Sequence, residues 1–262
     1  MESNLREKPK VVILAGGFGT RLSEETKIRP KPLVEINGKP LIWYIMSHFA
    51  AYGFNEFVIC AGYKGEMLKE YFFNYHLRNR DFTIETSRGT AVFHGAGIED
   101  WKVTVIDTGI ETMTGGRLQR VRNHLGEVFF MTYGDGVADV NLDLLLTRHI
   151  ESQKLATVTA VRPPSRFAVL EVSEGQSSVN SFREKPANEV GWINGGFFVL
   201  NKDVLGLIDG DETIWEREPL EKLATDGNLN AFFHNGFWHC VDSLRDKEHL
   251  EKLFSEKVRK NR

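Results

Sequence analysis

The chain has 262 residues, of which 41% are hydrophobic, so it is long enough to bury one large core, either as a single α/β domain with insertions or as two domains. Its formal net charge of −3 and isoelectric point near 6.3 exclude a general attraction to nucleic acid or anionic lipid, and favour small-molecule partners. Two distant cysteines, Cys60 and Cys240, exclude a disulfide framework and a CxxC metal site, and no apolar run approaches membrane-spanning length, so we expect a cytoplasmic protein without membrane contact.

The first half of the chain predicts strands and helices that alternate in a βαβ rhythm. An apolar run over residues 11–14 predicts the first strand, and residues 41–50 carry apolar side chains at helical spacing. Residues 83–108 lose helical periodicity, and the extended runs at 91–93 and 103–106 predict a β-hairpin-like insertion. The other predicted elements of this half are a strand over 56–61, a helix over 65–74, a helix from 115 to about 126, and a strand over 128–132.

The second half is richer in predicted β structure and ends in an amphipathic helix. Its predicted elements are a helix over 142–152, strands over 156–161, 169–172, 180–182 and 196–200, a helix over 215–224, an extended segment over 232–242, and the closing helix over 244–258. Together the elements predict one α/β domain over 1–262, with a Rossmann-like, mostly parallel sheet flanked by helices. We distinguish a charged extension over 1–10, the β-rich insertion, and a carboxy-terminal subregion over about 180–262.

A glycine-rich loop follows the first predicted strand, where α/β folds bind ligands. Gly16, Gly17 and Gly19 lack Cβ atoms, so backbone N–H groups can converge closely on phosphate oxygens. Arg21 and Lys31 add the fixed positive charge that glycines lack. This combination predicts a site for a nucleoside triphosphate.

Two familiar phosphate loops fit this segment poorly. Leu22 stands where a dinucleotide fingerprint places its third small residue, so that match is partial. A P-loop requires Lys and then Ser or Thr directly after its last glycine, whereas Thr20 and Arg21 follow here. A glycine-rich turn that merely reverses the chain remains the other interpretation.

Two aspartates are candidate metal ligands. Asp135 lies between two glycines directly after a predicted strand, beside the triphosphate loop, where it is suited to hold Mg²⁺ or simply to form a turn. Asp242 precedes the closing helix, so it is equally suited to a metal site and to the N-cap of that helix.

Two further segments have composition suited to a sugar phosphate. Pro186 ends regular pairing and projects Glu184 and Lys185 into a loop, where Glu can bond hydroxyls and Lys can neutralise a phosphate, although a solvated charged loop has the same composition. Gly195 and Gly196 open a buried strand and permit close approach of a ligand, or form a bulge.

Taken together, these motifs resemble those of the sugar-phosphate nucleotidylyltransferase family from residue 11 to the closing helix. LAGGFGTRL followed by RPKP is the family signature, and GDG, EKP and NGG follow in the family's order. Within the family, the resemblance is closest to members that use CTP and glucose 1-phosphate, on the features at 22–26, 107–109, 113–117, 132–139 and 215–220.

The resemblance implies the transfer of a cytidylyl group from CTP to glucose 1-phosphate with Mg²⁺, in the synthesis of dideoxyhexoses for bacterial surface polysaccharides. It implies nucleotide contacts from Leu14, Ala15, Gly16, Gly17, Gly19, Thr20, Arg21, Lys31, Thr112 and Arg117. It implies sugar-phosphate contacts from Tyr133, Glu184, Lys185, Asn194, Gly196 and Trp238, and Mg²⁺ ligation by Asp135 and Asp242. The catalytic group is expected to comprise Arg21, Lys31, Asp135 and Lys185.

Three alternatives stay open at this point. UTP or dTTP is a possible substrate in place of CTP, because spacing does not reveal which base is bound. A non-catalytic regulator that binds a sugar nucleotide would need the glycine loop but not the carboxylates, and a nicotinamide dehydrogenase is disfavoured by Leu22, Arg21 and Lys31. The resemblance also implies a homo-oligomer, with a hexamer as one candidate state.

Overall fold

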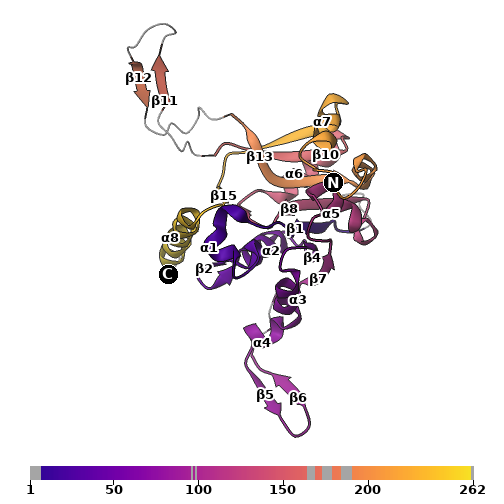
Figure 1. Ribbon diagram of the computed structural model, residues 1–262, viewed down its shortest axis with the longest axis vertical. Helices are drawn as coiled ribbons and strands as arrows, with labels where there is room; N and C mark the ends of the chain where they lie inside the picture. Colours follow the sequence, from indigo (N-terminus) through magenta and orange to yellow (C-terminus); the bar gives the residue numbers. More distant parts are fainter. Residues whose placement is uncertain are drawn as a thin grey trace.

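A seven-stranded sheet lies at the centre of the computed structural model, which describes residues 7–95, 97, 99–163, 169–172, 179–183 and 191–260 (Figure 1). The strands lie in the order β14-β10-β13-β8-β1-β4-β7. Strand β13 pairs antiparallel with β8 and β10, and the other neighbours pair in parallel. The prediction of a mostly parallel sheet is therefore confirmed. The strand bounds are β1 Lys10–Leu14, β4 Glu56–Ala61, β7 Lys102–Asp107, β8 Val128–Tyr133, β10 Ala156–Val161, β13 Ile193–Asn201 and β14 Leu229–His234.

Helices cover both faces of this sheet. Alternate residues of each strand point to opposite faces, so Val11 and Ile13 of β1 join one core while Val12 and Leu14 join the other. The first core includes residues of α2, α3, α6 and α8, and the second includes residues of α5 and α7. The helix bounds are α1 Ser23–Thr26, α2 Leu41–Ala51, α3 Gly65–Phe73, α4 Tyr75–Asn79, α5 Thr114–Arg120, α6 Leu142–Ser152, α7 Glu218–Thr225 and α8 Leu244–Lys260. Short 3₁₀ turns are η1 Thr20–Leu22, η2 Lys31–Leu33, η3 Arg122–His124 and η4 Lys202–Leu207.

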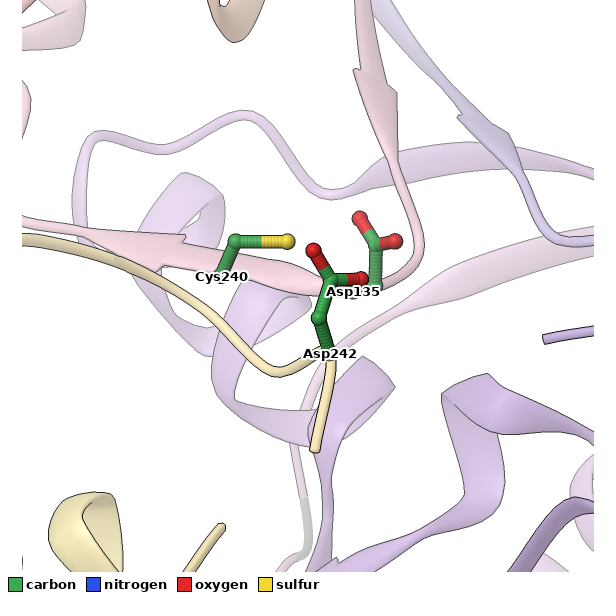
Figure 2. Close-up of side chains that lie close together, drawn as sticks. All are labelled: Asp135, Cys240 and Asp242. Atoms are coloured by element: carbon green, nitrogen blue, oxygen red, sulfur yellow. The ribbon is translucent and has the colours of Figure 1, made fainter. Parts of the chain in front are cut away.

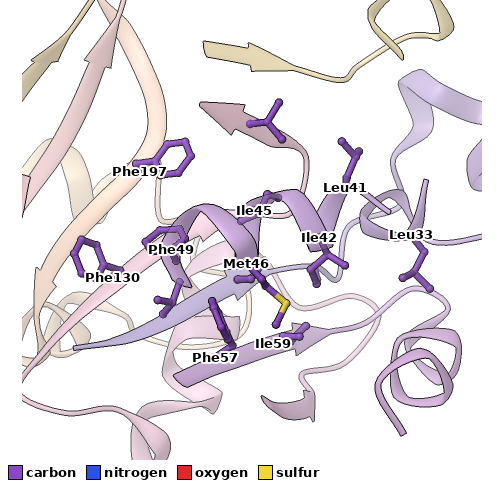
Figure 3. Packing of buried hydrophobic residues seen from close by; sticks show 14 of the residues in the cluster. Leu33, Leu41, Ile42, Ile45, Met46, Phe49, Phe57, Ile59, Phe130 and Phe197 are labelled. Atoms are coloured by element: carbon purple, nitrogen blue, oxygen red, sulfur yellow. The ribbon is translucent and has the colours of Figure 1, made fainter. Parts of the chain in front are cut away.

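Helix α2 shows how the predicted periodicity becomes packing. Its apolar stripe, which includes Ile42, Ile45 and Phe49, is buried against the sheet (Figure 3). The Phe49 ring stacks on Phe197 of β13 at a centroid distance of 5.9 Å and meets the edge of Phe130 of β8 at 5.4 Å. This packing fixes β8 and β13, whose ends carry candidate site residues.

The predicted β-hairpin-like insertion was wrong in its pairing. Strand β6 Thr90–Phe93 pairs antiparallel with β5 Phe82–Glu85, whereas β7 pairs in parallel with β4 and forms an edge of the central sheet. The side chains of residues 103–106 are half-buried at this edge of the sheet. The β5–β6 hairpin itself projects beyond α4 (Figure 1).

Three smaller strand pairs complete the description. Strands β2 Glu35–Ile36 and β3 Lys39–Pro40 form one pair, β11 Val169–Val172 and β12 Val179–Arg183 a second, and β9 Gly136–Ala138 and β15 Trp238–Cys240 a third. The expected carboxy-terminal subregion contributes β13 and β14 to the central sheet, so it is continuous with the main fold. Among the described helices, none combines the length and the apolar character needed to span a lipid bilayer.

Candidate active site

The glycine loop lies at the carboxyl end of β1, as predicted. Hydrogen bonds from the Gly134 nitrogen to the Leu14 oxygen, at 3.0 Å, and from the Tyr63 nitrogen to the Gly16 oxygen, at 3.1 Å, join it to neighbouring loops. Gly19 has a φ of 62°, in the left-handed region that favours glycine, and directly precedes η1. The chain turns at Gly19, and Arg21 lies in the short helical turn η1 that begins at the next residue.

Arg117 holds this loop in place by hydrogen bonds. Arg117 is 4% exposed as a residue, and its guanidinium donates to the carbonyl oxygens of Gly16, Ala61, Gly109 and Ile110 and to the Thr108 hydroxyl, at 2.7 to 3.2 Å. A Cβ on Gly16 would lie 2.1 Å from Arg117 Nη1, so glycine is required there by the arginine. Arg117 was expected to contact nucleotide; the structure gives it the additional task of joining the glycine loop to the segment that follows β7.

A cavity of about 400 Å³ opens above the loop. Its lining contains every residue for which the resemblance implied a nucleotide contact, namely Leu14, Ala15, Gly16, Gly17, Gly19, Thr20, Arg21, Lys31, Thr112 and Arg117. Residues from five separate parts of the chain therefore line one space, namely 14–21, 31–32, 110–117, 133–135 and 242. The nucleotide contacts themselves stay a prediction.

Two carboxylates and two cations meet at the floor of this cavity. The Lys31 ammonium donates to Asp135 Oδ2 and to Asp242 Oδ1, at 2.7 Å in both cases. Arg21 Nη1 lies 2.8 Å from Asp242 Oδ2. The structure thus brings Asp135 and Asp242 together across 107 positions of sequence, and the position between them already attracts a positive charge. A contact of Lys31 with phosphate stays a prediction.

The carboxylate of Asp242 is not used as a helix cap. The Ser243 hydroxyl accepts the Asp246 backbone N–H at 3.2 Å and donates to the Asp246 carboxylate at 2.8 Å, which makes Ser243 the cap of α8. The Asp242 nitrogen also donates to that carboxylate, at 3.1 Å. The N-cap interpretation of Asp242 was therefore wrong, and its side chain faces Lys31 and Arg21.

Two of these side chains, Lys31 and Asp242, have shifted pKa values. Burial alone would lower the pKa of Lys31, but the charges and hydrogen bonds of Asp135 and Asp242 outweigh burial and raise this pKa above its ordinary value. Burial alone would raise the pKa of Asp242, but the Lys31 ammonium and the Arg21 guanidinium outweigh it and hold this pKa below its ordinary value. Both groups are therefore charged at neutral pH.

A second cavity, of about 780 Å³, adjoins the first and shares Arg21, Tyr133, Asp135 and Asp242 with it. The remaining predicted sugar-phosphate residues that the structure describes, Asn194, Gly196 and Trp238, also line it. The Trp238 indole donates to the Gly195 oxygen at 2.8 Å, which holds the ring against the strand β13. Glu184 and Lys185 lie outside the described residues, so their predicted contacts stay predictions.

Sequence reasoning missed two residues of this region. Glu216 accepts hydrogen bonds from the Thr114 hydroxyl, at 2.6 Å, and from the Tyr133 hydroxyl, and so links the two cavities. Its signal was present in the segment 215–220, which carried the resemblance but no assigned role. Cys240 points toward Asp135 and Asp242 (Figure 2). Its position beside Asp135 follows from the pairing of β15 with β9, which the sequence did not reveal.

A larger cavity, of about 860 Å³, lies beside α3, α4 and β7. Its lining is partly aromatic, including Phe72, Phe73, Tyr75 and Trp101, and it does not include the glycine loop. We place the candidate active site at the two smaller cavities because the triphosphate loop, the cations and the paired carboxylates converge there.

Comparison with known proteins shows the family of the chain. A model of the nucleotidyl transferase family matches residues 10–241. A glucose-1-phosphate cytidylyltransferase from Salmonella typhi is 51% identical over 249 residues, which cover 94% of this chain and 96% of its own. A probable glucose-1-phosphate cytidylyltransferase from Bacillus subtilis is 42% identical over the same shares of the two chains.

Solved structures agree in fold. HddC from Yersinia pseudotuberculosis matches with a TM-score of 0.67 at 22% identity, over 94% of this chain and 100% of its own. A UDP-glucose pyrophosphorylase complexed with UDP-glucose matches with a TM-score of 0.66 at 18% identity, over 96% and 100%. These likenesses show the fold alone, whereas the family match covers most of the sequence. The chain therefore belongs to the nucleotidyl transferase family.

Proposed function

We propose that this protein is a glucose-1-phosphate cytidylyltransferase, which converts CTP and α-D-glucose 1-phosphate into CDP-glucose and diphosphate. The observation that carries the proposal is the 51% identity, across nearly the whole of both chains, to a protein of that activity. The two adjoining cavities support it, since they supply one space beside the glycine loop and another beside Tyr133 and Trp238.

The reaction needs no protein nucleophile. An oxygen of the sugar phosphate is already an anion at neutral pH; it attacks the α-phosphorus of CTP, and the bond from that phosphorus to the departing diphosphate oxygen breaks. No proton has to move. The protein must hold two polyanions together in line and offset their mutual repulsion, so positioning and fixed positive charge carry the catalysis.

Each named residue has a role in this proposal. Gly16, Gly17 and Gly19 present backbone N–H groups to the triphosphate, and Arg21 stabilises the charge that develops on the leaving diphosphate. Lys31 exchanges its carboxylate partners for phosphate oxygens once the nucleotide is bound. Lys185 places the phosphate of the sugar, and Tyr133 and Glu216 border the sugar cavity with hydroxyl and carboxylate oxygens.

The donor set at the floor of the site fits Mg²⁺. Asp135 and Asp242 each offer a carboxylate oxygen to the Lys31 ammonium, and a hard cation prefers one or two such carboxylates together with phosphate oxygens. We therefore propose that these two aspartates hold Mg²⁺. When bound, the ion supplies neutralisation of charge on the reacting phosphates.

Diphosphate release tests the proposal. With Mg²⁺ present, diphosphate should appear only when glucose 1-phosphate and CTP are supplied together, and EDTA should abolish its release. Equal turnover with UTP or dTTP would overturn the choice of CTP but keep the reaction class. Binding of nucleotide without turnover for any of the triphosphates would favour the non-catalytic regulator instead.

We also propose that the protein is a cytoplasmic homo-oligomer, on the basis of the family resemblance. Light scattering on the purified full chain measures the mass of the assembly. A mass equal to the 29.8 kDa of one chain would overturn this part of the proposal.

A further inference from the structure

The third ligand-type atom at the carboxylate pair is a thiol sulfur. Strand β15 pairs with β9 so that Cys240 lies opposite Gly136, the residue after Asp135, and the Val241 backbone N–H donates to the backbone carbonyl oxygen of Asp135 at 3.0 Å. Asp242 follows two residues later on the same segment. The backbone therefore brings the thiol and both carboxylates to one point, and Figure 2 shows their side chains directed toward one another.

The spacing of these atoms suits a single divalent ion. One oxygen each from Asp135 and Asp242 and the Cys240 sulfur all lie within 4.8 Å of one another. A tetrahedral ion with bonds of about 2.3 Å to sulfur and about 2.1 Å to oxygen holds its ligand atoms about 3.4–3.6 Å apart, so no pair needs to close by more than about 1.4 Å. Side-chain adjustments cover that distance.

A second observation shows that a cation is stable at this point. The Lys31 ammonium lies 2.7 Å from an oxygen of each aspartate, although the Lys31 side chain is only 12% exposed. The fold therefore places both carboxylates next to one positive charge. A divalent ion offers them twice that charge, so it competes with the ammonium for the same place.

Sulfur determines which divalent ions gain from the third ligand. Mg²⁺ takes oxygen ligands, so it gains nothing from Cys240, whereas Zn²⁺, Cd²⁺ and Co²⁺ bind thiolate sulfur and carboxylate oxygen together. We propose that Asp135, Cys240 and Asp242 form a binding site for a thiophilic divalent ion, chiefly Zn²⁺. The sulfur–metal bond forms as the Cys240 proton leaves to solvent, and the Lys31 ammonium moves out from between the aspartates.

The consequence rests on the proposed function. An ion held by all three side chains occupies the carboxylates that we assign to Mg²⁺, so Zn²⁺ at low concentration inhibits transfer in competition with Mg²⁺. The site thereby makes this enzyme sensitive to the supply of free thiophilic metal. Binding of the metal itself is independent of any turnover.

Metal titrations on the purified full chain test the site. Co²⁺ should give the ultraviolet thiolate-to-metal charge-transfer band with wild type, and Cys240→Ser should lose that band. In competition with a chromophoric chelator, Cys240→Ser should bind Zn²⁺ on the order of 100-fold more weakly. Its affinity for Mn²⁺, measured by electron paramagnetic resonance as a substitute for Mg²⁺, should stay within about 3-fold of wild type.

Cys60→Ala is the matched control, because Cys60 is the other cysteine of the chain and lies buried in the second core. It should keep the band and the Zn²⁺ affinity, and thermal unfolding shows whether each variant is folded. Equal Zn²⁺ affinity of folded wild type and Cys240→Ser, or a band that persists without Cys240, overturns the inference. Because these readouts use metal alone, failure of CDP-glucose formation contradicts the proposed function and leaves the metal site standing.

Discussion

Arg117 offers a sharp test of how the nucleotide loop is built. Its five hydrogen bonds reach the glycine loop, β4 and the segment after β7, and the acceptors are four carbonyl oxygens and one hydroxyl. Arg117→Met keeps much of the aliphatic stem and removes the donors. The five acceptors then lose their shared partner, and the loop loses its attachment to α5.

The structure sets the size of the effect. Hydrogen bonds from a charged donor contribute about 1.5–3 kcal/mol each, and a buried acceptor that is left unsatisfied costs about 1–3 kcal/mol, but these contributions do not add. Water from the adjoining cavity can reach some of the freed carbonyls, so we expect about 3–4 kcal/mol. In a chain of this size that corresponds to a fall in Tm of about 6–16 °C.

Calorimetry or thermal circular dichroism measures this change, and Arg120→Met is the matched control. Arg120 lies one turn further along α5, but its ion pair with Asp211 is exposed, so its loss should leave the Tm nearly unchanged. Arg117→Met should also weaken CTP binding by at least about 10-fold, because Gly16 is released. Weakened CTP binding at an unchanged Tm would refute the structural role and leave only a direct contact with the nucleotide.

Four further outcomes are expected. Arg21→Ala should lower kcat on the order of 10²–10³-fold with a smaller change in KM for CTP, because its contact strengthens as the leaving group gains charge; a change confined to KM contradicts that role. Lys185→Ala should raise KM for glucose 1-phosphate more than KM for CTP, and steady-state kinetics that show the reverse would place it at the nucleotide. Asp135→Asn should remove most of the Mg²⁺-dependent rate, and the double variant with Asp242→Asn should lose far less rate than the product of the two single losses. If the losses multiply, or if Asp242→Asn keeps a normal Mg²⁺ dependence, Asp242 does not share a metal site with Asp135. The folded-state pKa of Asp242 is lowered, so its ion pairs stabilise the fold above the ordinary pKa of 3.8 and are lost as the pH falls through the folded-state pKa. Asp242→Asn should therefore flatten the decline of Tm below about pH 4. An unchanged decline would show that the ion pairs do not stabilise the fold.

The parts of the fold that follow from hydrophobic periodicity could be predicted from the sequence. Strands β4 and β10 and helix α6 have the predicted bounds, and α2 differs by one residue, because each carries an unbroken apolar pattern between turn residues. Strand β7 was predicted to belong to a β-hairpin-like insertion, whereas it forms an edge of the central sheet. A short run of half-buried residues does not specify its neighbour, and β4 supplies the pairing from a distant part of the chain.

The site was predictable in composition and less so in arrangement. Ser243 and Asp246 form an S-x-x-D capping box. This pattern can be read from the sequence, and it predicts that Ser243, not Asp242, is the N-cap of α8. The position of Lys31 between Asp135 and Asp242 could not be read, since these contacts span 104 and 211 positions. Four of the five partners of Arg117 are backbone oxygens, which leave no trace in residue type.

The proposed reaction at this site is the transfer of a cytidylyl group to glucose 1-phosphate. A competition measures it most directly: CTP, UTP, dTTP and GTP are supplied at equal concentration with glucose 1-phosphate and Mg²⁺, and the nucleotide sugars formed are separated and identified by mass spectrometry. CDP-glucose should be the main product, and its formation should stop in Asp135→Asn. A predominance of another nucleotide sugar would contradict the choice of base, and the absence of every nucleotide sugar from the folded, CTP-binding protein would contradict the catalytic function itself.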